Sequence, residues 1–230
     1  MTVKKRTIGL ELEYADVQPK SLKSFLPDGW ETLGDSSIRN SDRSWSQYGK
    51  MNVLGAEVRT TKGQSLSWYK NGTLSTVLRS VQSLGGIANA SCGMHIHIGT
   101  FKPSRERLLS VADYFYRNPV AKLAGTSSER IKKQCSPIDY ELLNDFFTMD
   151  FDQLVNLCVA FPDGQHNYHR QREVNALSLL KYGTIEYRMF ASTLDEQQIL
   201  TAIEWCLALT DAYLNNLEVP LPEGPLPPPV

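Results

Sequence analysis

Four short segments of this chain alternate strictly between apolar and polar residues, and their polar positions carry glutamate, histidine or arginine. The segments are GLELEY from residue 9, GAEVRT from residue 55, GMHIHIG from residue 93 and TIEYRMF from residue 184. Side chains two residues apart point to the same face of a β-strand. The pattern therefore predicts four strands, each with one apolar face and one face of Glu, His and Arg.

The segments between these strands predict the fold class. Helical spacing of apolar residues is present at 64–84, 103–117, 137–147, 151–160 and 195–216. A strand–turn–strand unit is predicted at 30–40, and a β-hairpin is predicted around Gly183, between VNALSLLKY and TIEYRMFAS. Runs of strands interrupted by helices indicate an α+β fold with a mostly antiparallel sheet. We expect one domain over residues 1–218.

The last residues, VPLPEGPLPPPV (219–230), are dense in proline. Proline lacks a backbone N–H and does not extend regular structure. We expect an extended or disordered, solvated tail, with binding to an aromatic groove of a partner as the alternative.

Composition limits the classes of function. The formal net charge of −1 argues against a globally basic body, so nucleic-acid binding is not indicated. Four scattered cysteines without a CxxC pair, and no signal peptide, predict a cytoplasmic setting. The apolar segment 199–214 contains Glu204 and Asp211 and is shorter than the ~20 residues of a membrane span, so it is expected to be a core helix.

The polar faces of the four strands suggest a metal site. For any one strand, a solvated polar face is the simpler explanation. Four such faces with almost no Thr, Ser or Lys instead favour a shared site, in which neighbouring carboxylates repel one another and divalent cations offset their charge. Glutamates with one imidazole suit Mg²⁺ or Mn²⁺ better than Zn²⁺. The predicted metal ligands are Glu11, Glu13, Glu57, His95 and Glu186.

Two arginines and a second histidine share these faces. Arg59 and Arg188 offset part of the acidic charge, and arginine can hold nucleotide phosphates in a bidentate manner. Two cations would also neutralise a nucleotide triphosphate. His97 is expected to face the substrate or the nucleotide.

GLELEY, DSSI (35–38) followed by GAEVRT, CGMHIHIG and VNALSLLKYGTIEYRMFASTLD (174–195) together resemble the amidoligase family. That family belongs to the carboxylate–amine ligases of the glutamine synthetase and glutamate–cysteine ligase superfamily. The resemblance runs in order from about residue 7 to 215. It implies a curved antiparallel sheet like the glutamine synthetase catalytic domain, with helices on the convex face and the active site on the concave face.

The resemblance also implies a reaction and roles for individual residues. ATP would phosphorylate a carboxylate, and an amine would attack the acyl phosphate to form an amide or isopeptide bond. Glu11 and Glu13 would divide between the metal sites, Arg188 would stabilise the transferred γ-phosphoryl group, and His97 would lie near the substrate carboxylate. Glu57, His95 and Glu186 resemble the remaining metal ligands. Arg172 and Asn175 resemble nucleotide or phosphate contacts. Asp35 is equally consistent with a turn residue or a substrate contact.

Three alternatives stay open at this point. The chain could be a kinase-like phosphotransferase on the same fold, a zinc hydrolase built on His95 and His97, or a catalytically silent module that binds metal or nucleotide. The carboxylate and amine substrates are also open, from free amino acids and peptides to cell-wall precursors and modified nucleobases. The oligomeric state is not predicted.

Overall fold

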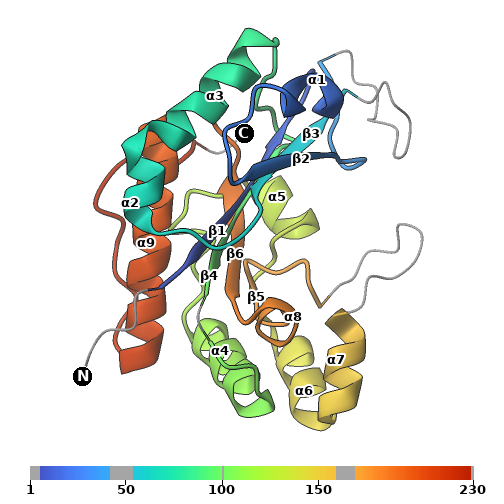
Figure 1. Cartoon of the computed structure of the whole chain (residues 1–230). Helices are drawn as coiled ribbons and strands as arrows, with labels where there is room; N and C mark the ends of the chain where they lie inside the picture. Colours follow the sequence, from blue (N-terminus) through green and yellow to red (C-terminus); the bar gives the residue numbers. More distant parts are fainter. Residues whose placement is uncertain (1–5, 42–53, 100, 159–168, 229–230) are drawn as a thin grey trace.

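The computed structural model describes residues 6–41, 54–99, 101–158 and 169–228, and these residues form a single open β-sheet with helices around it (Figure 1). The strand order is β2-β3-β1-β4-β6-β5, and all neighbouring strands are antiparallel. The strands are β1 (Ile8–Tyr14), β2 (Trp30–Gly34), β3 (Ala56–Thr60), β4 (Gly93–Ile98), β5 (Val174–Asn175) and β6 (Ile185–Ala191). The predicted α+β class with an antiparallel sheet is confirmed.

Helices occupy the segments between the strands. They are α1 (Pro19–Lys23), α2 (Leu66–Trp68), α3 (Leu74–Ser83), α4 (Arg105–Arg117), α5 (Ser128–Lys133), α6 (Tyr140–Thr148), α7 (Phe151–Cys158), α8 (Ser178–Tyr182) and α9 (Glu196–Asn215). In Figure 1, α2, α3 and α9 run along one side of the sheet, whereas α5 and α8 lie on the other side. Helices α4, α6, α7 and α9 match segments with helical spacing in the sequence, whereas α5 was not predicted.

The apolar side chains of the alternating strands pack under α9. Leu10, Leu12 and Tyr187 are fully buried, and the Tyr187 hydroxyl lies 2.9 Å from Oγ1 of Thr210 on α9. The polar residues of the same strands therefore point to the opposite side of the sheet. We call that side the acidic face; it carries Glu11, Glu13, Glu57, His95, His97, Glu186 and Arg188.

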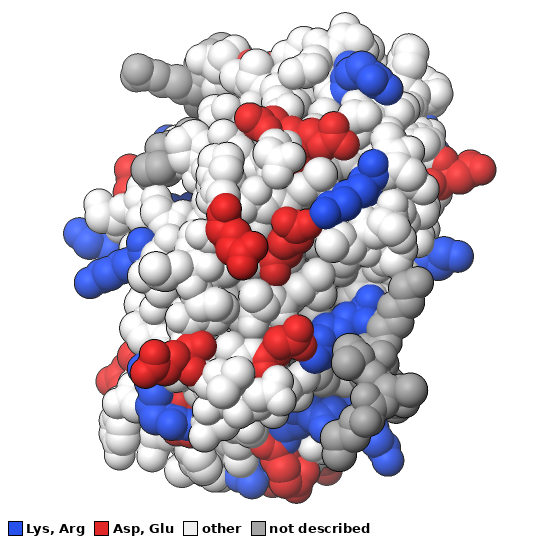
Figure 2. All heavy atoms as spheres, turned by 90° about the vertical axis from the view of Figure 1, so that its left-hand side faces the viewer, with Lys and Arg blue, Asp and Glu red and all other residues white. Residues whose placement is uncertain are grey.

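The outer surface of the helical side has a mixed charge. Lys, Arg, Asp and Glu are interspersed over the side seen in Figure 2, and no extended patch of one sign dominates that view. Helix α9 contributes ten buried residues, among them Ile199 and Trp205, as predicted for a core helix. No helix within the described ranges has both the length and the apolar character that spanning a membrane requires.

The helix predicted at 64–84 is interrupted. Helix α2 and helix α3 are separated by a wider turn, η1 (Tyr69–Thr73), in which Asn71 and Gly72 leave helical geometry. Gly72 has a φ of +90°, which glycine adopts without the steric cost that a Cβ would impose. The periodicity of the apolar residues does not report this break.

The β-hairpin predicted around Gly183 is confirmed only in part. Of the first predicted strand, only Val174 and Asn175 pair with β6, and Ser178–Tyr182 form α8. Gly183 ends α8 in the left-handed conformation at φ +67°, which is a common helix C-terminus. The apolar run in ALSLL fits one buried helical turn as well as a strand, and the glycine that suggested a turn is a helix stop.

The proline-rich tail is extended, as expected, but it is not a solvated end along its described length. The indole Nε1 of Trp205 donates a hydrogen bond to the Pro220 carbonyl oxygen at 2.8 Å. Val219 and Leu226 pack against the core, whereas Leu221 is exposed. Residues 229–230 lie outside the described residues.

Candidate active site

Strand pairing assembles the acidic face from residues far apart in the chain. Glu11 in β1 lies opposite Arg59 in β3 on one side and opposite His95 in β4 on the other. Glu186 in β6 lies opposite His97 in β4 and Asn175 in β5. Because the antiparallel register sets these neighbours, the polar side chains form a continuous row across the sheet.

A first cluster lies at the middle of this row. Ligand atoms of Glu11, His95 and Glu186 all lie within 4.8 Å of one another. Nδ1 of His95 is 3.1 Å from Oε2 of Glu11 and 4.0 Å from Oε1 of Glu186. We call this group the first acidic cluster.

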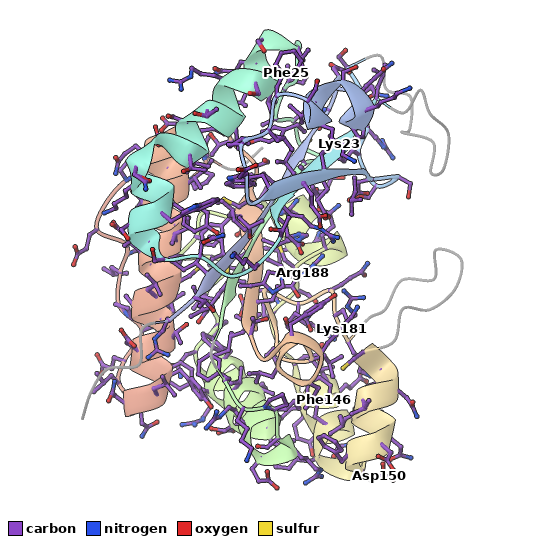
Figure 3. The ribbon with its side chains drawn as sticks, viewed as in Figure 1. Lys23, Phe25, Phe146, Asp150, Lys181 and Arg188 are labelled. Atoms are coloured by element: carbon purple, nitrogen blue, oxygen red, sulfur yellow. The ribbon has the colours of Figure 1, made fainter. Side chains whose placement is uncertain are left out.

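The surroundings of Glu186 hold this carboxylate in place. Its Oε2 accepts a hydrogen bond from Nδ2 of Asn175 at 2.7 Å, and its Oε1 pairs with the Arg188 guanidinium. Nη1 of Arg188 also lies 3.5 Å from Nδ1 of His95. Arg188 lies near the centre of the molecule, beside the strands (Figure 3). The structure thus brings Arg188 and Asn175 together with the predicted metal ligands.

A second cluster lies two residues further along β1, at Glu13. Ligand atoms of Glu13, Asp35 and Glu57 lie within 4.8 Å of one another. Glu13 and Glu57 are register partners, and Oε2 of Glu13 accepts the backbone N–H of Gly93 at 2.5 Å. We call this group the second acidic cluster. It includes Asp35, which the sequence left open between a turn residue and a substrate contact.

Asp35 reaches this cluster from a turn that follows β2. Its Oδ1 accepts hydrogen bonds from the backbone N–H and the hydroxyl of Ser37, both at 2.7 Å. The strand–turn–strand unit predicted at 30–40 is therefore correct in its first strand and its turn. No second strand follows this turn within the described part of the segment.

His97 lies on the same face, beside Glu11. Its Nε2 is 3.4 Å from Oε1 of Glu11, and its Nδ1 contacts the hydroxyls of Thr184 and Ser178 at 3.0 and 3.3 Å. The rings of His97 and the exposed Tyr182 form a T-shaped pair, with 6.0 Å between their centroids. Ser178 and Tyr182 belong to α8, so the helix that replaces the predicted hairpin strand helps to position His97.

Gly9 makes room for His97. The two residues are register partners in β1 and β4, and a Cβ on Gly9 would lie 3.2 Å from Cβ of His97. The first position of the G-x-E-x-E segment is thus a place where a side chain would crowd the imidazole.

Two predicted arginines lie differently from Arg188. Nε of Arg59 donates to Glu31 at 2.7 Å, and its Nη1 lies 3.5 Å from Oε1 of Glu57, so Arg59 borders the second acidic cluster. Arg172 is buried and donates through Nη1 to Ser136, to the Pro137 carbonyl and to Asp139. None of these Arg172 partners belongs to either acidic cluster.

The electrostatics of the first acidic cluster favour the charged forms. Burial alone would raise the pKa of Glu186, but the charges of Arg188, His97 and His95 lower it to about 2. Burial likewise opposes ionisation of Glu11, and hydrogen bonds with His95 and His97 overcome it and hold its pKa well below the usual value. Burial lowers the pKa of His97, but Glu186 and Glu11 outweigh this and raise it.

In the second acidic cluster, burial outweighs the compensating charges of Arg59, Arg130 and His95. Burial raises the pKa of Glu57 to about 8, with further contributions from the charges of Glu11, Glu13 and Asp35. Burial also raises the pKa of Glu13. Carboxylates that repel one another in a buried position are stabilised by a cation between them.

The donor sets of both clusters fit hard divalent cations. The first acidic cluster offers two carboxylates and one imidazole, and the second offers three carboxylates. Such oxygen-rich sets suit Mg²⁺ or Mn²⁺, whereas Zn²⁺ prefers more nitrogen or sulfur ligands.

One buried guanidinium at this site was not predicted from the sequence. Arg130 on α5 is 7% exposed and lies against Gly93, whose N–H bonds to Glu13. The signal that could have located it is the glycine at residue 93, on the same strand face as His95 and His97, where a side chain is missing.

Comparison with known proteins identifies the family. The model of a protein family described as "Putative amidoligase enzyme" matches residues 27–210, which is most of the chain. A search among curated proteins found no match to this chain.

Proposed function

The chain belongs to the amidoligase family, and we propose that it is an ATP- and Mg²⁺-dependent ligase that joins a carboxylate to an amine. The observation that carries this proposal is the pair of acidic clusters on one face of the sheet. Glu11 and Glu13, two residues apart on β1, contribute to different clusters, so two cations bound there would be close neighbours. Two adjacent divalent cations are a recurring arrangement in phosphoryl transfer.

The proposed metal ligands are those of the two clusters. Glu11, His95 and Glu186 would hold one Mg²⁺ or Mn²⁺, and Glu13, Asp35 and Glu57 would hold the other. When bound, these cations supply positive charge that balances the carboxylates and the phosphates of the nucleotide.

Arg188 is the proposed phosphoryl-binding residue. Its guanidinium is oriented by Glu186 and lies beside His95, and its buried Nε has no hydrogen-bond partner. Because charge develops on phosphoryl oxygens during transfer, an arginine held in place lowers the barrier without having to reorient. Asn175 supports this arrangement through its hydrogen bond to Glu186.

His97 is the proposed contact to the reacting carboxylate. The raised pKa of His97 favours an imidazolium, which would hold an anionic carboxylate and later an acyl phosphate oxygen. The hydroxyls of Ser178 and Thr184 fix its ring through Nδ1, so Nε2 is the atom directed toward Glu11 and the metal ligands.

The proposed reaction has two steps. A carboxylate oxygen of the acceptor attacks the γ-phosphorus of ATP, the bond to the β-phosphate oxygen breaks, and ADP leaves. An amine nitrogen then attacks the acyl carbon, inorganic phosphate leaves, and the amine loses a proton to give the amide. Neither step requires a nucleophilic side chain of the protein.

The substrates are proposed by class. They are a small-molecule or peptide carboxylate and an amine, with modified nucleobases still among the candidates. The proposed compartment is the cytoplasm, where ATP is available and where the four cysteines, all free and buried, would stay reduced.

The test is substrate-dependent release of ADP. The protein is incubated with ATP and Mg²⁺ and with pools of amino acids, peptides and other carboxylate–amine pairs. We expect ADP and free phosphate in equal amounts with at least one pool, and Glu186→Gln should abolish both. Glu204→Gln, which changes an exposed glutamate on α9, is the matched control and should keep full activity.

The same assay separates the alternatives. A kinase-like enzyme would form ADP and a stable phosphorylated acceptor without free phosphate. A hydrolase would act without nucleotide. A silent module would bind nucleotide without releasing ADP from any pool, and this last result would contradict the proposed ligase.

A further inference from the structure

Arg130 places a guanidinium on the acidic face at a position where a strand side chain is missing. Gly93, His95 and His97 alternate along β4 and share this face. A Cβ built on Gly93 would lie 2.2 Å from Nη2 of Arg130 and 3.1 Å from its Cζ. Gly93 does not adopt a positive φ, so the close approach of Arg130, and not the backbone, is what excludes a side chain there.

The hydrogen bonds of Arg130 go to uncharged acceptors. Nη1 donates to Oε1 of Gln134 at 2.8 Å, and Nη2 lies 3.4 Å from the Arg188 carbonyl oxygen. Nε is buried and has no hydrogen-bond partner. Among the described residues, Arg130 forms no ion pair with a carboxylate, in contrast to Arg59 and Arg188. Burial raises the pKa of Glu13, which contacts the same Gly93, and the charge of Arg130 lowers it, but the buried Nε remains a donor without an acceptor. An unsatisfied buried donor is costly, which suggests that an oxyanion meets this guanidinium when substrate binds.

The position of Arg130 defines where such an anion would lie. The guanidinium contacts Gly93, and the N–H of Gly93 is bonded to Glu13 of the second acidic cluster. The Arg130 nitrogen that lies against Gly93, Nη2, also reaches the backbone carbonyl of Arg188. An oxyanion at Arg130 would therefore lie next to the second acidic cluster and close to the arginine proposed to bind the transferred phosphoryl group.

We propose that Arg130 is a substrate-binding residue that holds an oxyanion on the acidic face, either a phosphate of the nucleotide or the carboxylate of the acceptor. This inference rests on the proposed ligase function and adds a residue to it. Guanidinium binds both kinds of oxyanion in the same planar, bidentate manner. Gly93 is then required because a side chain at this position would displace the guanidinium of Arg130.

The experiment uses the full chain and four proteins: wild type, Arg130→Gln, Gly93→Ala and the double variant. Binding of β,γ-imido-ATP with Mg²⁺ is measured by calorimetry. Binding of a carboxylate is probed with acetate. It is measured as the rise in unfolding temperature that acetate causes in the presence of saturating Mg–ADP. Arg117→Gln, an exposed arginine of α4 paired with Asp113, is the matched control for loss of one positive charge.

The expected result is a loss of about 10- to 100-fold in affinity for the probe whose oxyanion contacts Arg130, since hydrogen bonds to charged groups contribute at this level. Gly93→Ala should give a similar loss, because the new methyl group displaces the end of a flexible side chain. The double variant should be no weaker than either single variant. Arg130→Lys, which keeps the charge but loses the planar fork, should recover part of the affinity.

The outcomes also separate this inference from the proposed function. Weaker nucleotide binding assigns Arg130 to a phosphate, and a weaker response to acetate alone assigns it to the acceptor carboxylate. If folded variants bind the nucleotide as wild type does and respond to acetate equally or not at all, the role of Arg130 is overturned while the ligase proposal stands. Failure of the wild type to bind nucleotide overturns both.

Discussion

Nδ1 of His95 lies 3.1 Å from Oε2 of Glu11 on the neighbouring strand, although the two residues are 84 positions apart in the chain. Their backbones are register partners in β1 and β4. The first acidic cluster is therefore held by paired strands, and sites built on paired strands keep their geometry better than sites on loops. The second acidic cluster differs, because Asp35 comes from a turn.

Asp35→Asn tests the composition of the second acidic cluster. We expect the variant to bind one of two Mn²⁺ ions about 10- to 100-fold more weakly, because even outer partners of metal ligands change affinity by this much. The other ion should bind unchanged. Electron paramagnetic resonance of free Mn²⁺ during a titration counts the ions, with exposed Asp28→Asn as the control. Unchanged binding of both ions would show that Asp35 is only a turn residue.

Glu173→Gln tests a buried carboxyl away from the two clusters. Oε2 of Glu173 accepts the backbone N–H groups of Val120 and Ala121, and burial raises the pKa of Glu173 to about 7. A carboxyl with a raised pKa stabilises the fold fully below its unfolded pKa, and this contribution is lost as the pH rises through about 7. Glutamine imitates the neutral form, so the variant should lose less stability than wild type over this range.

The measurement for Glu173→Gln is urea unfolding at pH 5 and pH 8. From pH 5 to pH 8, the free energy of unfolding of the variant minus that of wild type should rise by up to about 3 kcal/mol. Glu141→Gln, at an exposed position on α6, should show no such shift. The same difference at both pH values would mean that Glu173 titrates like an exposed glutamate.

Two leucines of the proline-rich tail provide a matched pair. Leu226 packs against the core, whereas Leu221 is 70% exposed. Leu226→Ala should lower the free energy of unfolding by about 1 to 2 kcal/mol, because apolar contacts are lost. Leu221→Ala should stay within about 0.5 kcal/mol of wild type. Denaturant unfolding compares them, and equal effects would indicate that the tail is not part of the fold.

Much of the acidic face could be predicted because period-two alternation determines which side chains share a face. Glu11, Glu13, His95 and Glu186 were identified in this way, before the strand order was known. Pairing of strands that are distant in the chain then places these residues together. That step follows from tertiary packing and cannot be calculated from the alternation alone.

The features that were missed depend on contacts that leave little local signal. Helix α5 is six residues long and its sequence has no clear apolar stripe, so Arg130 could not be placed. The segment before Gly183 forms α8 and brings Ser178 to His97, because a short apolar run fits either a strand or a buried helix. The packing of the tail depends on Trp205, whose partner Pro220 is set by the tertiary fold.

The central claim is that two neighbouring cations bind on the acidic face, and anomalous diffraction from crystals grown with Mn²⁺ and β,γ-imido-ATP tests it most directly. We predict two manganese peaks, one among Glu11, His95 and Glu186 and one among Glu13, Asp35 and Glu57, with the nucleotide phosphates between them. Manganese peaks elsewhere, or nucleotide bound away from both clusters, would contradict the account.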